Sequence, residues 1–414
     1  MKWIAAGMVC PISALPSPVR FSFYDLYGGE GMVGFDKVKK IGTFTEQLPS
    51  EGCEDVFSRF NKSEYVMFPG FCDVHVHFRE PGFSYKETIA TGAAAAAASG
   101  YTAVCTMPNL NPVPDSLEHL QPQLDRIAEV PIAVLPYGSI TVGEKGREIS
   151  ALEELAPHVV AFSDDGVGVA DDGIMREAMQ RCKALGKLIA GHCEDMRCED
   201  PREREWREVE RNLRLADETG CAFHVCHIST KESVDLIRGA KRSGVNVSCE
   251  TAPHYLLLNR ALIEDDGRFK MNPPIHSAED QGALLEALTD GTIDMIATDH
   301  APHGAEEKSR GFEKSLNGIV GLETAFPALY TGLVSDGIIS LEKLIDLMSA
   351  SPASRFSIPI SGDFAIWDLT HDYTIDPTKF RSKGRSTPFD AWPVLGKCLL
   401  TVHGGKAIYI SEDK

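Results

Sequence analysis

The chain has 414 residues, of which 43% are hydrophobic and 24% are charged, and its formal net charge is −19 at pH 7. This composition is typical of a globular protein with enough apolar side chains for a core. The acidic charge argues against binding to nucleic acid or to an anionic membrane, because both require clustered Lys and Arg. No apolar run is long enough for a membrane-spanning helix.

The 11 cysteines are an odd number, and they are scattered without a repeated Cys-X-X-Cys spacing. Cys105, Cys226 and Cys249 lie in apolar, strand-like runs. This pattern predicts free, buried thiols in a reducing compartment, and we therefore expect a cytoplasmic protein. The apolar stretch over residues 3–10 is short and lacks a small-residue cleavage site, so it is interpreted as a strand and not as a signal peptide.

From about residue 70 to residue 340, short apolar runs alternate with longer amphipathic ones. The strands predicted by the apolar runs are 72–76, 102–106, 132–136, 159–162, 188–190, 222–226, 246–249 and 292–297. Helices are predicted over 86–98, 174–185, 203–219, 231–242 and 281–288. Repeated strand–helix units indicate an α/β fold, namely a (β/α)₈ TIM-like barrel.

The two ends of the chain have a different pattern. Residues 1–65 and 356–414 contain short apolar stretches separated by Gly, Pro and Asp, such as 364–369 and 399–402. We expect a small β side domain formed from both termini. Residues 66–355 are predicted to form the barrel domain.

Two histidines end the first predicted barrel strand. His75 and His77 are two residues apart, so their side chains point to the same side of a strand. Alone, such a pair is equally compatible with one buried structural histidine and one incidental one. Other strand ends decide between these interpretations, because they carry Asp165, His192, His227 and Asp299. Catalytic groups of this barrel gather at the C-terminal ends of its strands, so we expect a metal site there.

Four imidazoles and two carboxylates without a thiolate suit zinc, and Mn²⁺ or Co²⁺ are expected to substitute in vitro. Six ligands exceed one tetrahedral site but fit two ions bridged by Asp165. Two ions about 3.5–4 Å apart can share a hydroxide and polarise a carbonyl together. Cys193 and Cys226 follow and precede ligand positions, so they are expected to point away into the core.

Several motifs together resemble the bacterial class I dihydroorotases of the amidohydrolase superfamily. They occur in that family's order and are PGFCDVHVHFREPG (69–82), TMPN (106–109), FSDDG (162–166), GHCE (191–194), VCHIST (225–230), KMNPP (270–274), ATDHAPH (297–303) and STPF (386–389). The resemblance implies a zinc-dependent enzyme that cyclises N-carbamoyl-L-aspartate reversibly to L-dihydroorotate in de novo pyrimidine (UMP) biosynthesis. It also implies two zinc ions per subunit, bridged by Asp165 and a hydroxide.

The residue between the metals separates related families. Hydantoinase-like members of the superfamily use a carboxylated lysine there, whereas this sequence has Asp165, as class I dihydroorotases do. Asp164 is the competing candidate, and Asp165 is preferred because it directly precedes Gly166. The resemblance further implies that Asp299 is a metal ligand. Our hypothesis for the reaction is that the shared hydroxide attacks the ring amide and that Asp299 is the general acid/base.

Dihydroorotate carries a carboxylate, so its site should present a guanidinium and hydrogen-bond donors. By resemblance, Arg79, Asn109 and His303 hold this carboxylate, and Asn272 meets the ring amide. On residue type alone, Asn109 and Asn272 are equally compatible with turn positions near proline. The polar segment 304–318 is expected to be a loop whose Asn317-Gly318 backbone also touches substrate. The family often has an aromatic residue where Asn317 stands, which leaves the role of Asn317 open.

Two alternatives remain at this stage. One is a hydrolase of neutral cyclic amides such as hydantoins, dihydropyrimidines or allantoin, which would not need Arg79 and His303. The other is an inactive barrel that scaffolds aspartate transcarbamoylase, although such a homologue is expected to lose ligands and all six are present. We expect a homodimer acting on a small molecule, with association with aspartate transcarbamoylase also open.

Overall fold

The computed structural model describes residues 65–412 and three two-residue strands before them. These are β1 (Val19–Arg20), β2 (Ser22–Phe23) and β3 (Thr43–Phe44), of which β1 and β3 pair antiparallel. The remaining residues of 1–64, and residues 413–414, lie outside the described part. The strand expected over residues 3–10 falls among them.

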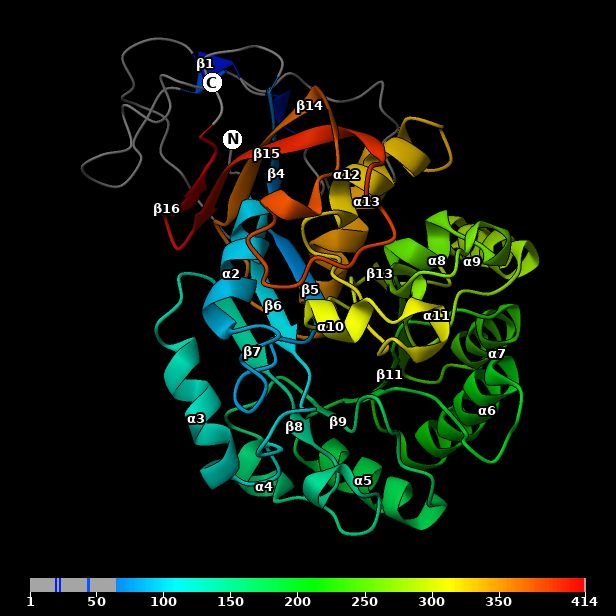
Figure 1. Cartoon of the computed structure of the whole chain (residues 1–414). Helices are drawn as coiled ribbons and strands as arrows, with labels where there is room; N and C mark the ends of the chain where they lie inside the picture. Colours follow the sequence, from blue (N-terminus) through cyan, green and yellow to red (C-terminus); the bar gives the residue numbers. More distant parts are fainter. Residues whose placement is uncertain (1–18, 21, 24–42, 45–64, 413–414) are drawn as a thin grey trace.

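Parallel strands form the centre of the molecule (Figure 1). One sheet has the order β5-β6-β7, and the other has the order β8-β9-β10-β11-β12-β13. Only Tyr137 separates β7 from β8, so these two segments act as one strand position. The strands are β5 (Phe71–Val76), β6 (Tyr101–Thr106), β7 (Ala133–Pro136), β8 (Gly138–Ser139), β9 (Phe162–Ser163), β10 (Ile189–Gly191), β11 (Phe223–Val225), β12 (Val247–Thr251) and β13 (Met295–Ile296).

The ring of strands closes between β5 and the segment after β13. Val76 forms a parallel bridge with His300, and the His77 N–H donates to the His300 carbonyl over 2.8 Å. Deeper in the barrel, the Asp73 carboxylate accepts from the backbone N–H and the hydroxyl of Thr298, at 3.1 and 2.6 Å. The expected (β/α)₈ barrel is confirmed, and its parallel strands all end at one face.

Most helices cover the outside of the barrel, whereas two short ones belong to the loop over residues 304–318 (Figure 1). The helices are α2 (Ile89–Ala98), α3 (Leu117–Ile127), α4 (Leu152–Leu155), α5 (Asp172–Ala184), α6 (Pro201–Thr219), α7 (Lys231–Arg242), α8 (Pro253–Leu257), α9 (Ala278–Asp290), α10 (Ala305–Lys308), α11 (Gly311–Lys314), α12 (Ala325–Leu329), α13 (Leu341–Met348) and α14 (Ala350–Arg355). The five predicted helices are α2, α5, α6, α7 and α9, with ends that differ by zero to three residues.

The alanine-rich helix α2 packs closely against the barrel because its buried side chains are small. A capping box between Thr88 and Thr91 starts the helix. A Cβ atom at Gly92 would lie 2.4 Å from the Phe78 ring, so this position admits only glycine without rearrangement. The close approach brings the β5–α2 loop, which carries Arg79 and Lys86, alongside the barrel mouth.

Some predicted strands differ from the observed ones. The run 159–162 is buried or partly buried, but β9 begins only at Phe162, where ladder pairing with β8 and β10 begins. Residues 292–297 likewise contain only the two-residue strand β13. Apolar composition reports burial, whereas strand assignment also requires a neighbour in register.

A second sheet lies against the barrel and has the order β16-β15-β14-β4-β2. Its other strands are β4 (Tyr65–Pro69), β14 (Phe364–Thr374), β15 (Pro393–His403) and β16 (Lys406–Ile410). Trp367 of β14 is buried with its ring 4.3 Å from Phe326 and 5.7 Å from Phe71 of the barrel. The expected β side element from both termini is therefore confirmed.

Two further expectations concern membrane-spanning helices and the oxidation state of the cysteines. No helix in the described residues is long and apolar enough to cross a membrane. The nine cysteines within the described residues are all free, and all but Cys198 are buried. This agrees with the expectation of buried thiols.

Candidate metal centre and substrate site

His75 and His77 meet at the mouth, as strand alternation predicts. His75 is the penultimate residue of β5, and His77 directly follows the strand. His75 Nε2 lies 3.6 Å from Asp299 Oδ1, and His77 Nε2 lies 3.1 Å from the same oxygen. Both side chains are buried. Both imidazoles therefore face the carboxylate of Asp299, which lies in the segment after β13.

Asp165, which follows β9, lies between two pairs of imidazoles. Its Oδ1 is 3.4 Å from His75 Nε2, and its Oδ2 is 3.6 Å from His77 Nε2. On its other side, Oδ1 lies 3.7 Å from both His192 Nδ1 and His227 Nε2. A carboxylate in this position can contact two cations at once.

The neighbouring Asp164 has a different environment. Its Oδ1 accepts from the N–H groups of Ile140 and Thr141 at 2.7 and 3.0 Å, and its Oδ2 accepts from the Thr141 hydroxyl. Asp164 therefore braces the loop after β8. This geometry leaves Asp165 as the carboxylate that faces the histidines.

His192 and His227 follow the adjacent strands β10 and β11. His192 Nδ1 lies 3.0 Å from His227 Nε2. Two ring nitrogens at this distance require either a shared proton or a cation bound by both. Both side chains are buried, so water does not freely screen them.

Backbone strain gathers at this mouth. His227 and Asp299 have φ values of 31° and 47°, and Arg79 has a φ of 42°. Non-glycine residues rarely adopt this left-handed region, and such strain is maintained where the surrounding structure demands a particular side-chain direction. The three strained residues are all predicted site residues.

The donor set fits zinc in both atom type and spacing. In a tetrahedral zinc site with bonds of about 2.0–2.1 Å, neighbouring ligand atoms lie about 3.4 Å apart. The separations among the six candidate ligands given above range from 3.0 to 3.7 Å. His75 Nε2 and Asp165 Oδ1 are buried and have no hydrogen-bond partner among the described residues. Such orphaned atoms are expected where a cation is the missing partner.

The electrostatics also suit a cation. Burial alone would raise the pKa of Asp299, but the hydrogen bond with His77 and the surrounding imidazoles hold that pKa well below its usual range. Burial likewise opposes ionisation of Asp165, but the charges of the surrounding imidazoles, that of His75 foremost, hold the pKa of Asp165 well below its usual range. Both carboxylates are therefore ionised at neutral pH, as metal ligands must be.

Two glutamates at the site were missed by sequence analysis. Glu250 on β12 accepts from His75 Nδ1 at 2.7 Å and lies 3.1 Å from His224 Nε2. Glu194 lies 3.3 Å from His192 Nε2, and hydrogen bonds from His192 and other neighbours lower its pKa to about 2. Glu194 was visible beside His192 in the sequence, whereas the role of Glu250 depends on a contact across 175 residues.

The two cysteines beside ligand positions differ. Cys193 is buried and its sulfur contacts Gly191 and Asn212, in agreement with a core position. Cys226 is also buried in the core, but it does not point away from the site. Its sulfur lies within 4.8 Å of the ligand atoms of His75 and Glu250. The barrel interior brings this side chain beneath His75, which strand alternation alone did not indicate.

The predicted substrate residues lie on two sides of the mouth. On one side, Arg79 Nε donates to the Pro302 carbonyl over 3.4 Å, next to His303. His303 Nε2 donates to the Asn317 carbonyl over 2.6 Å. Gly318 has a φ of 129°, and a Cβ there would lie 2.6 Å from the Ala301 carbonyl. Asn317 itself is exposed.

The two predicted asparagines contact candidate metal ligands or their neighbours. Asn109 Oδ1 accepts from His77 Nδ1 at 2.8 Å, and Asn109 Nδ2 lies 3.3 Å from Asp165 Oδ2. On the opposite side, Asn272 Nδ2 donates to Glu194 over 2.9 Å. Neither amide therefore serves only as a turn residue.

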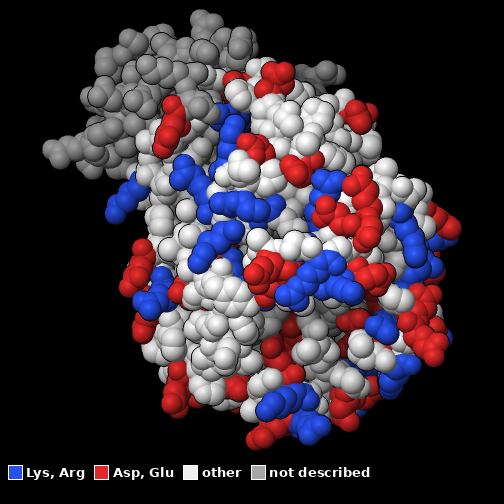
Figure 2. All heavy atoms as spheres, in the orientation of Figure 1, with Lys and Arg blue, Asp and Glu red and all other residues white. Residues whose placement is uncertain are grey.

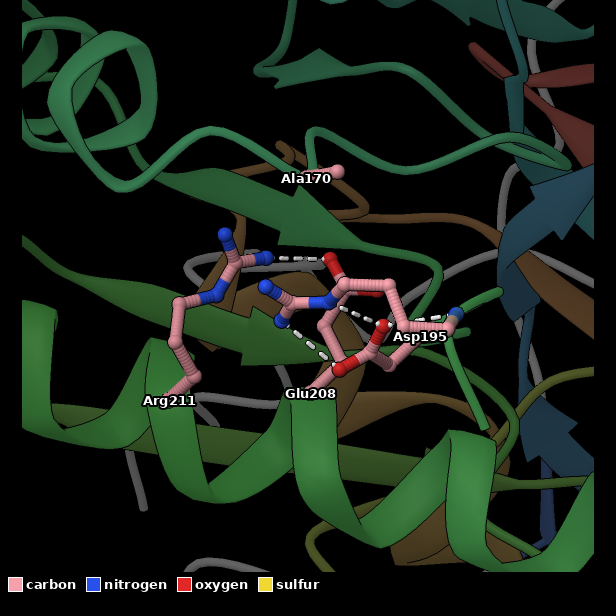
Figure 3. Close-up of a pocket in the computed structure, with 5 residues that line it drawn as sticks. Ala170, Asp195, Glu208 and Arg211 are labelled. Atoms are coloured by element: carbon pink, nitrogen blue, oxygen red, sulfur yellow. Dashed lines mark hydrogen bonds and ion pairs between the residues drawn. The ribbon is translucent and has the colours of Figure 1, made fainter. Parts of the chain in front are cut away.

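Residues 195–210 are rich in charged side chains, yet one face of α6 is buried. Glu205 and Glu208 are only 4% exposed. Glu208 accepts from the Glu194 N–H at 2.9 Å and pairs with Arg211 on the next turn. Figure 3 shows this polar pocket, with Glu208 and Arg211 on α6 and Asp195 on the facing loop. The buried acids brace the loops that carry His192 and His227.

Comparison with known proteins shows to which family the chain belongs. The model of the Dihydro-orotase-like family matches residues 64–202. A dihydroorotase from Fusobacterium nucleatum is 45% identical over 406 residues, which span 92% of this chain and 94% of that protein. The chain belongs to the dihydroorotase family. A dihydroorotase from Bacillus cytotoxicus is 44% identical and spans 90% of this chain and 93% of that protein.

Solved structures place this dihydroorotase family member in the same fold as other cyclic-amide hydrolases. The L-hydantoinase (dihydropyrimidinase) from Arthrobacter aurescens has a TM-score of 0.75 and 28% identity, covering 83% of this chain and 85% of that one. The dihydropyrimidinase from Brevibacillus agri has a TM-score of 0.74 at 24% identity, which is a likeness of fold.

Proposed function

We propose that the chain catalyses the reversible cyclisation of N-carbamoyl-L-aspartate to L-dihydroorotate, the dihydroorotase step of pyrimidine biosynthesis. The observation that carries the proposal is the position of Asp165 between the pair His75/His77 and the pair His192/His227. The proposed ligands of two zinc ions are His75, His77, Asp165, His192, His227 and Asp299, with Asp165 as the bridge. The proposed catalytic domain is 66–355, and the proposed side domain is 1–65 with 356–414.

When bound, the two ions would supply an activated water and polarise the ring amide carbonyl. We assign the proton transfers to Asp299, whose ionised Oδ1 lies 3.1 Å from His77 Nε2 at the mouth. In ring opening, this carboxylate takes a proton from the attacking water and gives it to the departing ring nitrogen. In ring closure, it removes the proton from the carbamoyl nitrogen as that nitrogen attacks the side-chain carboxyl carbon of the substrate. It then gives this proton to the departing carboxyl oxygen, which takes a second proton from solvent and leaves as water.

The proposed substrate contacts divide between the two sides of the mouth. Arg79, Asn109 and His303 hold the substrate carboxylate, and Asn272 contacts the ring amide. Support comes from the Arg79 guanidinium, which forms no ion pair with the described residues and is free to pair with an anion. The Asn317-Gly318 backbone is proposed to close over the substrate from the 304–318 loop.

The competing function is hydrolysis of a neutral cyclic amide. The structural likeness to an L-hydantoinase is the observation that favours it. The two functions differ in the need for a cation beside the ring. Purified, zinc-loaded enzyme should open L-dihydroorotate far faster than dihydrouracil or allantoin. Replacing Arg79 with Met should abolish this preference, and equal rates on charged and neutral rings in the wild type would contradict the proposal.

We also propose that the enzyme is a homodimer and that aspartate transcarbamoylase is a candidate partner. Exposed apolar side chains on loops at the catalytic end support a protein contact there, since Tyr85, Val167 and Met196 are 62%, 53% and 64% exposed. Light scattering of the purified chain, alone and mixed with the transcarbamoylase, tests both statements. A mass that stays at one chain in both samples would refute them.

A further inference from the structure

Three basic side chains lie together at the mouth, although the chain as a whole is acidic. Arg79 and Lys86 come from the β5–α2 loop, and His303 comes from the segment after β13. Lys86 Nζ lies 3.1 Å from His303 Nδ1 and 3.2 Å from Glu307 Oε1. The Lys86 side chain is only 11% exposed, so it is held against the protein and not extended into water.

The contacts of His303 determine which ring nitrogen carries its proton. Nε2 lies 2.6 Å from the Asn317 carbonyl, which can only accept, so Nε2 is the protonated nitrogen. Nδ1 then has a free lone pair, and it accepts from the Lys86 ammonium. Burial, followed by the charges of Arg79 and Lys86, lowers the pKa of His303 to about 3. The imidazole is therefore neutral, and the positive charge at this position belongs to Lys86.

The charge balance leaves room for an anion. Glu307 is the carboxylate nearest Lys86, and it also accepts from the Tyr85 hydroxyl at 3.0 Å and from the Gly304 N–H at 2.8 Å. Arg79 has no ion-pair partner among the described residues, and the carboxylates of Asp299, Asp165 and Glu307 act on it only from a distance. The remaining N–H groups of its guanidinium are therefore available to an anion. Figure 2 shows Lys and Arg side chains gathered on this face between α2 and α10, whereas acidic side chains line its margins. A local excess of positive charge attracts an anionic substrate to an otherwise acidic protein.

We propose that Lys86 is a specificity residue for the substrate carboxylate and acts through His303. Its ammonium holds the imidazole in the tautomer that presents Nε2–H as a donor and places a positive charge behind that ring. A substrate carboxylate replaces the Asn317 carbonyl as the acceptor, because a charged acceptor forms the stronger hydrogen bond. This inference rests on the proposed function and adds to it a residue that none of the sequence motifs indicated.

The test is steady-state kinetics in both directions with three variants of Lys86. Lys86→Gln and Lys86→Met remove the charge, and we expect the KM for L-dihydroorotate and for N-carbamoyl-L-aspartate to rise about tenfold while kcat stays within about twofold. Lys86→Arg keeps the charge and should keep KM close to that of the wild type. Lys187→Gln is the control, because Lys187 is also a partly buried lysine, and it donates to the Val159 carbonyl away from the mouth.

Metal content is measured on every variant, so that a change in KM is not confused with loss of zinc. Wild-type KM values in Lys86→Gln and Lys86→Met would overturn the inference while leaving the proposed function intact. A fall in kcat and melting temperature at unchanged KM would overturn it as well, because that pattern indicates a structural role. A wild-type enzyme without turnover of L-dihydroorotate would refute the proposed function and this inference together.

Discussion

Glu250 Oε1 lies 2.7 Å from Nδ1 of His75, across the interior of the barrel. The contact continues downward, since Glu250 Oε2 lies 3.1 Å from His224 Nε2 and His224 Nδ1 lies 2.8 Å from the Ser248 hydroxyl. Arg355 Nε donates to the same hydroxyl over 2.7 Å. With Nδ1 of His75 donating to Glu250, its Nε2 carries no proton, faces Asp165 and is available as the proposed metal-ligand atom.

This relationship predicts that Glu250 controls metal affinity. Glu250→Gln should weaken zinc binding about 10–100-fold, because the carboxylate that orients the imidazole and increases its basicity is lost. Competition with a chromophoric chelator measures the affinity. Glu264→Gln serves as the control, because Glu264 is 66% exposed and pairs with Arg268 away from the mouth. Unchanged zinc affinity in Glu250→Gln would refute an orienting role.

Asp299→Asn tests the assignment of the proton transfers. The amide keeps the shape of the side chain but cannot accept and return a proton, so kcat should fall about 10²–10⁴-fold in both directions. Rates are compared at saturating substrate, with zinc content measured on the same samples. Near-normal turnover at full metal content would remove Asp299 from the mechanism.

Glu205 on α6 is predicted to be a stabilising residue despite its place in a charged run. Its carboxylate accepts from the N–H groups of Ser229 and Thr230 at 3.0 and 3.1 Å and from the Ser233 hydroxyl at 2.7 Å. Glu205→Ala leaves these buried donors unpaired and should lower the free energy of unfolding by about 3 kcal/mol or more. Denaturant unfolding of zinc-loaded protein measures it.

The matched control for this prediction is Glu203→Ala in the same helix. Glu203 is about 40% exposed, and among the described residues its ion-pair partner is Arg207 one turn later. Its loss should change the free energy of unfolding by less than about 0.5 kcal/mol. Equal effects of the two substitutions would show that Glu205 is no more than a surface acid.

Lys308 gives a prediction for pH dependence. Its ammonium donates to the carbonyls of Lys270 and Leu316 at 2.9 and 2.7 Å, and burial, with the nearby charge of Lys270, lowers its pKa to about 7. The unfolded chain binds the proton more tightly, with a pKa near 10.5. The folded state is therefore penalised as pH falls from 10.5 towards 7, and stability rises with pH across this window.

The difference in unfolding free energy between wild type and Lys308→Met isolates this group. It should rise in favour of the wild type between pH 7.5 and 9, by up to about 1.4 kcal/mol per pH unit. Unfolding curves at several pH values, with zinc held in excess, provide the comparison. A difference that does not vary with pH would show that Lys308 titrates normally.

Sequence periodicity predicted those parts of the site that depend on local geometry. His75 and His77 meet because side chains two apart on a strand share a side, and Asp165, His192, His227 and Asp299 join them because parallel barrel strands end at one face. Arg79 and His303 were predicted from the family resemblance. Arg79 donates to the carbonyl of Pro302, which is the residue before His303.

Contacts between elements far apart in sequence could not be predicted in this way. Glu250 contacts His75 across the barrel, and Glu205 contacts the segment after β11 from a helix whose first turns are rich in charged residues. The position of Cys226 beneath His75 depends on the stagger of neighbouring strands. A single sequence contains no information on that stagger.

The central claim is that six side chains at the barrel mouth hold two catalytic zinc ions. Metal-free enzyme, prepared with a chelator and then titrated with zinc while L-dihydroorotate turnover is followed, tests it most directly. Activity should be absent without metal and should reach its plateau at about two zinc ions per chain. Full activity of the metal-free enzyme, or a plateau at one ion, would contradict the account.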